Sequence, residues 1–207
     1  VETAEQQILT QVWHKTLNLP IAIHKADNSL FYDYDTNGNI LQKRKLDTVS
    51  KATEIWTYSY TENGSIATED GPRMNIDDIT SYQYYPNGRL WRIINPLGHT
   101  LEILEYDAHG RAVKLKDHNA VITTLSYNLR GQLTSQNVGG EVTLNSYDNT
   151  GNLTQTISPD QTATTYQYDG AGRLVLSRDH WNNETRYQYD INSHLIKQSV
   201  HALDGTI

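Results

Sequence analysis

Hydrophobic and polar residues alternate along most of this chain with the two-residue period of a β-strand. In the segment Tyr166-Gln167-Tyr168, both tyrosines would point to one face of a pleated strand and the glutamine to the other. The same alternation recurs at residues 32–34, 58–60, 82–84 and 187–189. None of these segments has the 3.6-residue period of an amphipathic helix. The pattern therefore predicts an all-β protein.

A turn signal follows each alternating segment, and residues 168–174 (YDGAGRL) show it most fully. An aspartate at the first turn position can accept a hydrogen bond from the backbone N–H two residues later. The second glycine of this segment can adopt the positive φ that side chains disfavour. Together they predict a type I turn closed by a left-handed glycine bulge, which is a three-residue hairpin loop. This loop would place Tyr168 opposite Leu174, and Tyr34 opposite Ile40, as cross-strand pairs.

The turn signal occurs eight times, so the chain is a repeat array. Its glycine stands at positions 38, 64, 88, 110, 131, 151 and 172, and a serine replaces it at 193. The spacings are therefore 26, 24, 22, 21, 20, 21 and 21 residues. A second turn signal lies between successive glycines, at 95–98, 117–120, 158–161 and 179–182. Each repeat is thus expected to contain two strands and two turns, with strain or a different loop at Ser193.

The predicted structural motif consists of the repeated tyrosines, aspartates, glycines and arginines. We expect these residues to form the hairpins. The motif residues are Tyr34, Asp35, Gly38, Tyr60, Gly64, Tyr84, Gly88, Arg89, Tyr106, Asp107, Gly110, Arg111, Tyr127, Gly131, Tyr147, Asp148, Gly151, Tyr168, Asp169, Gly172, Arg173, Tyr189 and Asp190. We expect antiparallel hairpin repeats of about 21 residues that form one curved, wound sheet.

The repeat spacing predicts a single array over residues 1–207. It would consist of an irregular N-terminal repeat at 1–37, two long repeats with insertions at 38–87, and regular repeats at 88–207. The chain starts without methionine and stops soon after a motif copy, so we expect it to be a fragment of a larger protein. A polar loop at 46–54 is predicted to hold the first insertion.

Local turn signals complete the prediction in the irregular regions. Strands are expected at 8–13 and 21–24 around a bend at 17–20, with a frayed segment before them at 1–6. A helix over residues 3–17 is the competing interpretation. A sharp turn is expected at Asp70-Gly71-Pro72-Arg73, and Gly139-Gly140 is expected to form a β-bulge in the shortest repeat.

Composition limits the kind of sheet that this chain can form. Only 37% of its 207 residues are hydrophobic, and 14 tyrosines accompany a single phenylalanine. Such a sheet would have one aromatic and one polar face and no thick apolar core. The net charge of −7 disfavours nucleic-acid binding, which requires a basic surface. No apolar run reaches the roughly 18 residues of a membrane span, and the absence of cysteine excludes disulfides and thiolate metal sites.

The sequence shows no catalytic or metal-binding constellation. The eight histidines include no His-x-x-x-His pair, and His118 and His180 fall in the second turns, where a surface role is favoured. Asp77 and Asp78 lack a third ligand at the spacing of a calcium loop, which favours a solvated turn. No segment resembles a nucleophile elbow. We therefore expect a protein that is not an enzyme and that needs no metal or cofactor.

The motif Tyr-Asp-x-x-Gly-Arg-Leu, complete at 168–174 and nearly complete at 106–111, resembles that of the Rhs/YD-repeat family. The resemblance extends over residues 8–200. It implies a β-sheet strip wound into a hollow shell around a C-terminal toxin domain, as in type VI secretion effectors and insecticidal toxin complexes. The implied partners are the rest of the shell, the toxin, and subunits of the secretion apparatus or toxin complex. The implied location is outside the cell or on the bacterial surface.

Two further expectations concern surfaces. Aromatic repeats also build carbohydrate- and choline-binding modules, so a glycan-binding or adhesion module is the alternative function. Sheet packing is favoured because the recurring tyrosines flank the hairpin turn opposite aliphatic residues, whereas the four tryptophans occupy unrelated phases of the repeat. The unpaired strand edges of such a fragment predict edge-to-edge self-association.

Overall fold

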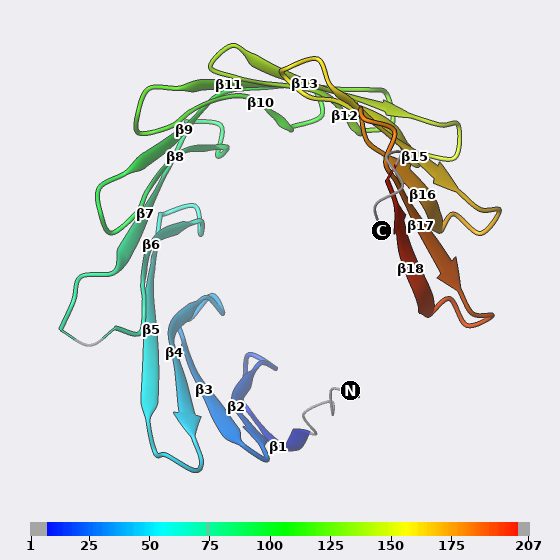
Figure 1. Cartoon of the computed structure of the whole chain (residues 1–207). Helices are drawn as coiled ribbons and strands as arrows, with labels where there is room; N and C mark the ends of the chain where they lie inside the picture. The colour runs from blue at the N-terminus through cyan, green and yellow to red at the C-terminus, as the bar shows by residue number, and fades with distance from the viewer. Residues whose placement is uncertain (1–7, 74, 203–207) are drawn as a thin grey trace. The chain divides into compact units, whose positions relative to one another are not determined.

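The computed structural model describes residues 8–73 and 75–202, which form eighteen β-strands and no helix (Figure 1). Accordingly, this part of the chain has no helix with the length and apolar character of a membrane span. The strands are β1 (Ile8–Trp13), β2 (Pro20–Lys25), β3 (Asn28–Tyr34), β4 (Ile40–Asp47), β5 (Thr53–Tyr60), β6 (Ile66–Asp70), β7 (Ile79–Tyr84), β8 (Leu90–Ile94), β9 (Thr100–Tyr106), β10 (Ala112–Lys116), β11 (Ile122–Tyr127), β12 (Leu133–Val138), β13 (Glu141–Tyr147), β14 (Leu153–Ile157), β15 (Ala163–Tyr168), β16 (Leu174–Arg178), β17 (Glu184–Tyr189) and β18 (Leu195–His201).

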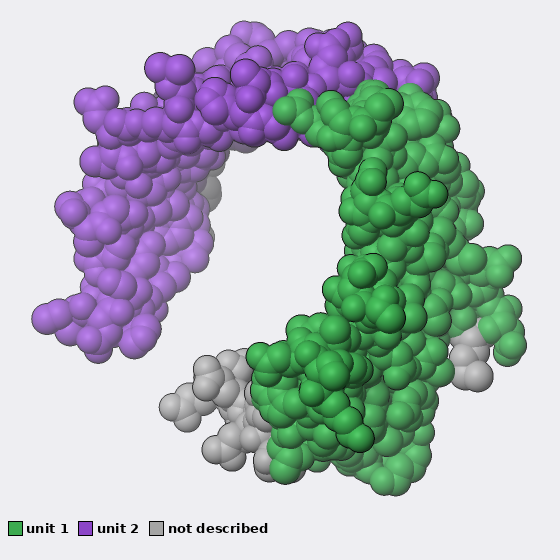
Figure 2. Space-filling model, turned by 180° about the vertical axis from the view of Figure 1, so that it is seen from behind, with its two compact units in different colours: residues 1–102 green, residues 103–207 purple. Residues whose placement is uncertain are grey.

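Each strand pairs antiparallel with the next strand in the sequence, so the topology is a meander. The chain divides into two compact units, residues 1–102 and 103–207, which Figure 2 shows in different colours. The division falls within β9. The antiparallel hairpin-repeat fold predicted from the sequence is confirmed.

The hairpin loops have the predicted geometry. Tyr34 pairs with Ile40 and Tyr168 with Leu174, each next to a shift in register. In the loop after Tyr168, the Asp169 N–H donates to the Arg173 carbonyl at 3.0 Å. The Gly172 N–H donates to the Asp169 carbonyl at 2.9 Å. Gly172 has a φ of +77°. These contacts define a type I turn with a glycine bulge.

The loop at Ser193 is not different from the others. Ser193 donates to the Asp190 carbonyl at 3.1 Å, and Asp190 donates to the His194 carbonyl at 2.9 Å, as in the glycine copies. Ser193 has a φ of +66°, a left-handed conformation that costs a residue with a Cβ about 1–2 kcal/mol. The expectation of strain is therefore confirmed, and that of a different loop is wrong, because the flanking contacts force the same conformation.

The second turns repeat the same loop without requiring glycine. Asn95 donates to the His99 carbonyl at 3.0 Å, and Gly98 donates to the Asn95 carbonyl at 2.9 Å. At the position of Gly98, the other three second turns have Ala120, Gln161 and Asn182, with φ of +64°, +66° and +65°. One loop type therefore closes both ends of the strands in these repeats.

Very little of this protein is buried. Among the described residues, only Ala22 and Ile103 are buried hydrophobic residues, at 7% and 8% exposure. The repeat strands instead carry rows of half-buried side chains, such as Tyr166 and Tyr168, which alternate with the exposed Gln167. The predicted sheet without a thick apolar core is confirmed, so hydrogen bonds and partly buried aromatic rings must contribute much of its stability.

Two local predictions need correction. Gly139 and Gly140 form a two-residue hairpin turn, because Val138 pairs directly with Glu141 and both glycines have positive φ (+59° and +105°). They are therefore not a bulge. The polar loop expected at 46–54 is confined to 48–52, because β4 and β5 extend into its two ends and absorb much of the insertion as paired strand.

The N-terminal region follows the strand interpretation. β1 and β2 occupy the expected positions, and Asn18, with a φ of +53°, lies in the bend between them. The competing helix is wrong for residues 8–17, since residues 8–13 pair with β2. The frayed segment expected at 1–6 lies outside the described residues. At the sharp turn expected at 70–73, β6 ends at Asp70 and the chain bends at Pro72.

Candidate functional site

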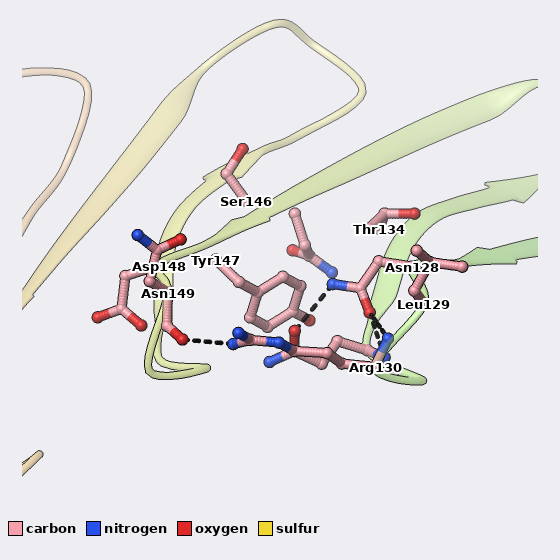
Figure 3. A pocket seen from close by; sticks show the side chains of 10 residues that line it. Asn128, Leu129, Arg130, Thr134, Ser146, Tyr147, Asp148 and Asn149 are labelled. Carbon is pink, nitrogen blue, oxygen red and sulfur yellow. Dashed lines mark hydrogen bonds between the residues drawn. The ribbon is translucent and has the colours of Figure 1, made fainter.

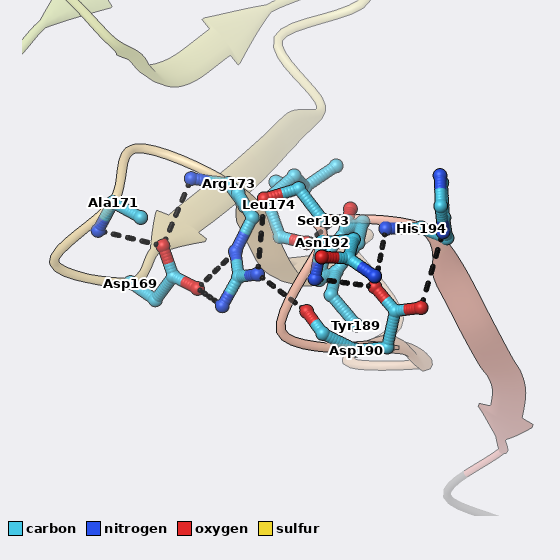
Figure 4. Close-up of polar contacts among 9 residues, drawn as sticks. All are labelled: Asp169, Ala171, Arg173, Leu174, Tyr189, Asp190, Asn192, Ser193 and His194. Atoms are coloured by element: carbon cyan, nitrogen blue, oxygen red, sulfur yellow. Dashed lines mark hydrogen bonds and ion pairs between the residues drawn. The ribbon is translucent and has the colours of Figure 1, made fainter.

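The motif aspartates hold the hairpin loops through their side chains. Asp169 Oδ1 accepts the backbone N–H of Ala171 at 2.9 Å, as predicted, and also that of Arg173 at 3.0 Å (Figure 4). One carboxylate oxygen thus fixes both sides of the turn. The same pair of contacts occurs at Asp35, Asp107, Asp117, Asp148, Asp179 and Asp190.

The residue after the glycine binds the second carboxylate oxygen. Arg173 donates from Nε and Nη2 to Asp169 Oδ2, both at 2.7 Å, so two charged donors share one carboxylate oxygen. Arg111 binds Asp107 in the same way at 2.6 Å. Where the sequence has asparagine at this position, its amide donates instead, as from Asn152 to Asp148 at 3.0 Å. In the loops that begin with aspartate, arginine and asparagine both serve as this donor, whereas in the loop at Asn128 the direction is reversed and Gln132 Oε1 accepts from Asn128 Nδ2 at 2.8 Å.

These hydrogen bonds favour the charged form of the aspartates. The backbone N–H of Arg173, followed by its guanidinium, lowers the pKa of Asp169 below the usual value. The Thr150 hydroxyl and then the backbone N–H of Asn152 lower the pKa of Asp148, against a smaller opposing effect of burial. The loops are thus built for an ionised aspartate.

The arginines also connect one hairpin to the next. Arg173 Nη1 donates to the Asp190 carbonyl at 3.1 Å and to Ser193 Oγ at 3.3 Å (Figure 4). Its guanidinium lies over the ring of Tyr189, 5.0 Å from the centroid. Arg111 lies over Tyr127 at 4.5 Å. The same side chain therefore closes its own loop and binds the following hairpin.

Neighbouring loops make similar links without a YD arginine. Gln132 Nε2 donates to the Gly151 carbonyl at 2.8 Å, and Arg130 Nη1 donates to the Asn149 carbonyl (Figure 3). The second unit therefore carries a row of linked hairpin tips along one edge of its strands.

The motif tyrosines form a second set of links between repeats. Six of their hydroxyls donate to the carbonyl of the first residue of an earlier strand, which lies 14 to 20 residues before the tyrosine in the sequence. These contacts join Tyr34 to Pro20 (2.8 Å), Tyr60 to Ile40 (2.7 Å), Tyr84 to Ile66 (2.7 Å), Tyr127 to Ala112 (3.5 Å), Tyr147 to Leu133 (2.9 Å) and Tyr189 to Leu174 (2.9 Å). We call this set the tyrosine ladder. The sequence placed these residues on one face but gave no sign of the hydroxyl contacts.

Grooves separate the hairpins of successive repeats. Two of them, in the second unit, lie one repeat apart and have volumes of about 540 and 730 Å³. Figure 3 shows the first, between the loop at Asn128 and the loop at Asp148. Much of the polar lining already bonds to the protein: Thr134 donates to Ser126, and Asn145 to Leu133. These two side chains of the first groove are therefore engaged within the protein.

The candidate chemical residues of the sequence do not converge on one site. His180 packs against Trp181 at the tip of a second turn, with 3.6 Å between ring centroids. Within residues 8–73 and 75–202, no group of three or more histidine, aspartate or glutamate side chains could hold a metal ion. The contacts that recur are instead structural: the links between hairpin loops and the hydroxyl bonds of the tyrosine ladder.

Comparison with known protein families identifies the family to which this repeat architecture belongs. A family model described as the Teneurin YD-shell matches residues 29–201, which is most of the chain. The chain belongs to this family of YD-repeat proteins. The resemblance expected from the motif at 168–174 is thereby confirmed.

Solved structures agree on the fold of this YD-repeat chain. A crystal structure of TcdB2-TccC3 matches 91% of the chain with a TM-score of 0.65 and 16% sequence identity, and one of TcdB2-TccC3-TEV matches 93% with a TM-score of 0.64 and 15% identity. The chain spans only 11% of each of those chains. A search of curated proteins gave no match.

Proposed function

We propose that this chain is a wall segment of a YD shell that encloses a C-terminal toxin domain of the same polypeptide and carries it to other cells. The match of residues 29–201 to the YD-shell family carries this proposal. The proposed role is structural, and we propose that the segment has no catalytic activity and uses no cofactor.

The construction of the sheet supports a role as a wall. A globular domain is stabilised by a core, but here the described residues include only two buried hydrophobic side chains. Links between repeats take the place of that core. Neighbouring hairpin tips bind each other along one edge of the strands, and the tyrosine ladder joins six hairpins to an earlier strand. A single layer held together in this way can extend without a thick interior, as a shell wall must.

The partners in this proposal follow from the length of the related proteins. Because the chain spans 11% of the matched solved chains, the rest of the wall would come from the remainder of its own shell. The enclosed toxin domain would be the cargo, and subunits of a toxin complex or secretion apparatus would be the outer partners. We place the whole protein outside the cell or on the bacterial surface.

Electron microscopy of the full-length protein tests the proposal. We expect a hollow particle with cargo density inside, and protection of the C-terminal domain from a protease that digests the same domain when it is released. A solid particle or an extended rod without a cavity would refute the shell function. An activity screen of the segment against hydrolase substrates should remain at background.

The alternative of a glycan-binding module is less well supported. Carbohydrate sites expose aromatic rings for stacking, whereas the ladder tyrosines are partly buried and use their hydroxyls within the protein. A glycan array distinguishes the two functions. Specific binding that Tyr147→Ala abolishes without loss of stability would favour the alternative.

A further inference from the structure

Two carboxyl groups meet at the base of the connection between β6 and β7. Asp70 is the last residue of β6 and lies opposite Ile79, the first residue of β7. Asp78 comes directly before β7 and is only 8% exposed. The side chains of Asp70 and Asp78 are within hydrogen-bonding reach of each other. Neither residue belongs to the YD motif.

The surrounding residues fix the position of the Asp78 carboxylate. It lies so close to Gly71 that a Cβ there would be 2.4 Å from Oδ2 and 2.8 Å from Cγ. Arg73 donates to the same Oδ2 from its backbone N–H at 3.2 Å and from Nε at 3.1 Å. The other oxygen, Oδ1, is buried and has no hydrogen-bond partner among the described residues. A buried acceptor without a donor is costly, so this oxygen requires a partner.

The charges at this site do not balance if both carboxyl groups are ionised. Asp70 and Asp78 would contribute two negative charges, and Arg73 contributes one positive charge. The register partners of Asp70 are Thr57 on β5 and Ile79 on β7, which carry no charge. The remaining neighbouring charge, on the exposed Asp77, is negative. With the exposed Asp77 solvated, the pair of Asp70 and Asp78 therefore lacks one positive charge.

A proton fits this site better than a metal ion. A single proton on Asp70 restores the balance and supplies an O–H donor to the Asp78 carboxylate. Calcium would require six to eight oxygen ligands, and no cluster of three ligating side chains exists in the described residues.

We propose that Asp70 and Asp78 hold one proton between them as a carboxyl–carboxylate hydrogen bond, and that this bond fastens the end of β6 to the start of β7 in acid and is lost towards neutral pH. The site is a proton-binding device in the first unit, and it does not depend on the proposed shell function.

The electrostatics agree with this assignment. Burial, and then the neighbouring Asp78, raise the pKa of Asp70 above its usual value. Burial also acts to raise the pKa of Asp78, but the hydrogen bonds from Arg73 outweigh it, so this pKa is lowered. A raised pKa gives stability that is lost as the pH rises through it, and a lowered pKa gives stability that is lost as the pH falls through it. The connection between β6 and β7 is therefore most stable at a pH between these two pKa values, where Asp70 is protonated and Asp78 is ionised.

Hydrogen–deuterium exchange of the full chain tests the proposal. Rates at about pH 4.5 and about pH 7.5 are corrected for the intrinsic pH dependence of exchange. We expect protection in peptides from β6 and β7 to fall several-fold at the higher pH, while peptides from β16 and β17 keep theirs. Equal corrected protection of β6 and β7 at both pH values would overturn the proposal.

Three variants identify the groups involved. Asp70→Asn places a permanent N–H donor beside Asp78, so protection should no longer depend on pH. Asp77→Asn is the matched control and should keep the pH dependence of the wild type. Gly71→Ala displaces the Asp78 carboxylate and should lower protection at both pH values. Unchanged pH dependence in Asp70→Asn would overturn the proposal, as would full recovery of protection at about pH 7.5 on addition of calcium or magnesium.

Discussion

The contribution of the tyrosine ladder to stability can be tested by removing a single hydroxyl oxygen. Tyr189 and Tyr187 lie two residues apart on β17 and on the same face of the strand. The Tyr189 hydroxyl donates to the Leu174 carbonyl at 2.9 Å, whereas the structure gives the Tyr187 hydroxyl no hydrogen bond to any described residue. Tyr189→Phe and Tyr187→Phe therefore remove the same atom from similar surroundings, and only the first breaks a contact between repeats.

The expected cost follows from the value of one hydrogen bond. Such a bond contributes about 0.5–1.5 kcal/mol net, and more if its loss leaves a buried group unpaired. Tyr189 is half-buried, so water can partly satisfy the Leu174 carbonyl, and we expect a loss of about 1 kcal/mol. This corresponds to roughly a five-fold change in the unfolding equilibrium constant. The aromatic ring remains, so the contact with the Arg173 guanidinium is kept.

Urea unfolding of the two variants measures this difference. With a denaturant dependence of about 2 kcal/mol per molar, the midpoint of Tyr189→Phe should fall by about 0.5 M and that of Tyr187→Phe should not change. Hydrogen exchange should show the loss of protection at the start of β16, which contains Leu174. The pair Tyr60 and Tyr58 on β5 repeats the test in the first unit, because Tyr60 bonds to Ile40.

Equal effects of the two substitutions would refute this reasoning. If Tyr189→Phe and Tyr187→Phe both left the midpoint unchanged, the hydroxyl contacts would add nothing to the links between repeats. If both lowered it equally, the loss would come from a general change in ring hydration rather than from the bond to Leu174.

Further predictions concern the loops and the strand edge. Gly172→Ala should destabilise the protein by about 1–2 kcal/mol in thermal unfolding, because φ is +77° there, while Gly170→Ala in the same loop, with open space around it, should be neutral. Ser193→Gly relieves left-handed strain but also removes the long contact of Arg173 Nη1 with Ser193 Oγ and adds chain entropy, so the stability should rise by no more than about 0.5 kcal/mol; a lower melting temperature would contradict this. The lowered pKa of Asp169 stabilises the fold above the pKa of the unfolded chain, about 4, and this contribution is lost as the pH falls, so Asp169→Asn should flatten the pH dependence of urea unfolding between about pH 3 and about pH 7. Val200 on β18 is 56% exposed, and Val200→Lys should reduce edge-to-edge association in light scattering; unchanged particle size would count against an edge contact at this strand.

The hairpins could be predicted from the sequence because their causes are local. In the segment from Tyr168 to Leu174, the aspartate that accepts the turn N–H groups, the glycine with positive φ and the cross-strand pair all lie within seven residues. The repetition of this motif along the chain then predicts where the other hairpins lie. The same local reasoning predicts the turn at 117–120 but not the left-handed conformation of Ala120 in it, because a left-handed alanine leaves no signal in the sequence.

The role of the residue after the glycine could be predicted only in part from the sequence. Arginine at 173 matches the motif and asparagine at 152 does not, although both side chains donate to the aspartate of their own loop. A sequence motif records residue types, whereas the loop depends on a hydrogen bond between its first residue and the residue after the glycine, which arginine, asparagine and glutamine can all make.

The sequence by itself determined the strands, the hairpin loops and the family, because each depends on residues close together in the chain or on a repeated motif. Only the tertiary structure decided which distant groups meet: the Tyr189 hydroxyl and the Leu174 carbonyl, the guanidinium of Arg173 and the next loop, and the carboxyl groups of Asp70 and Asp78. These contacts depend on strand register and on insertions between repeats. No local pattern encodes them, because the atoms that meet are brought together by the pairing of whole strands.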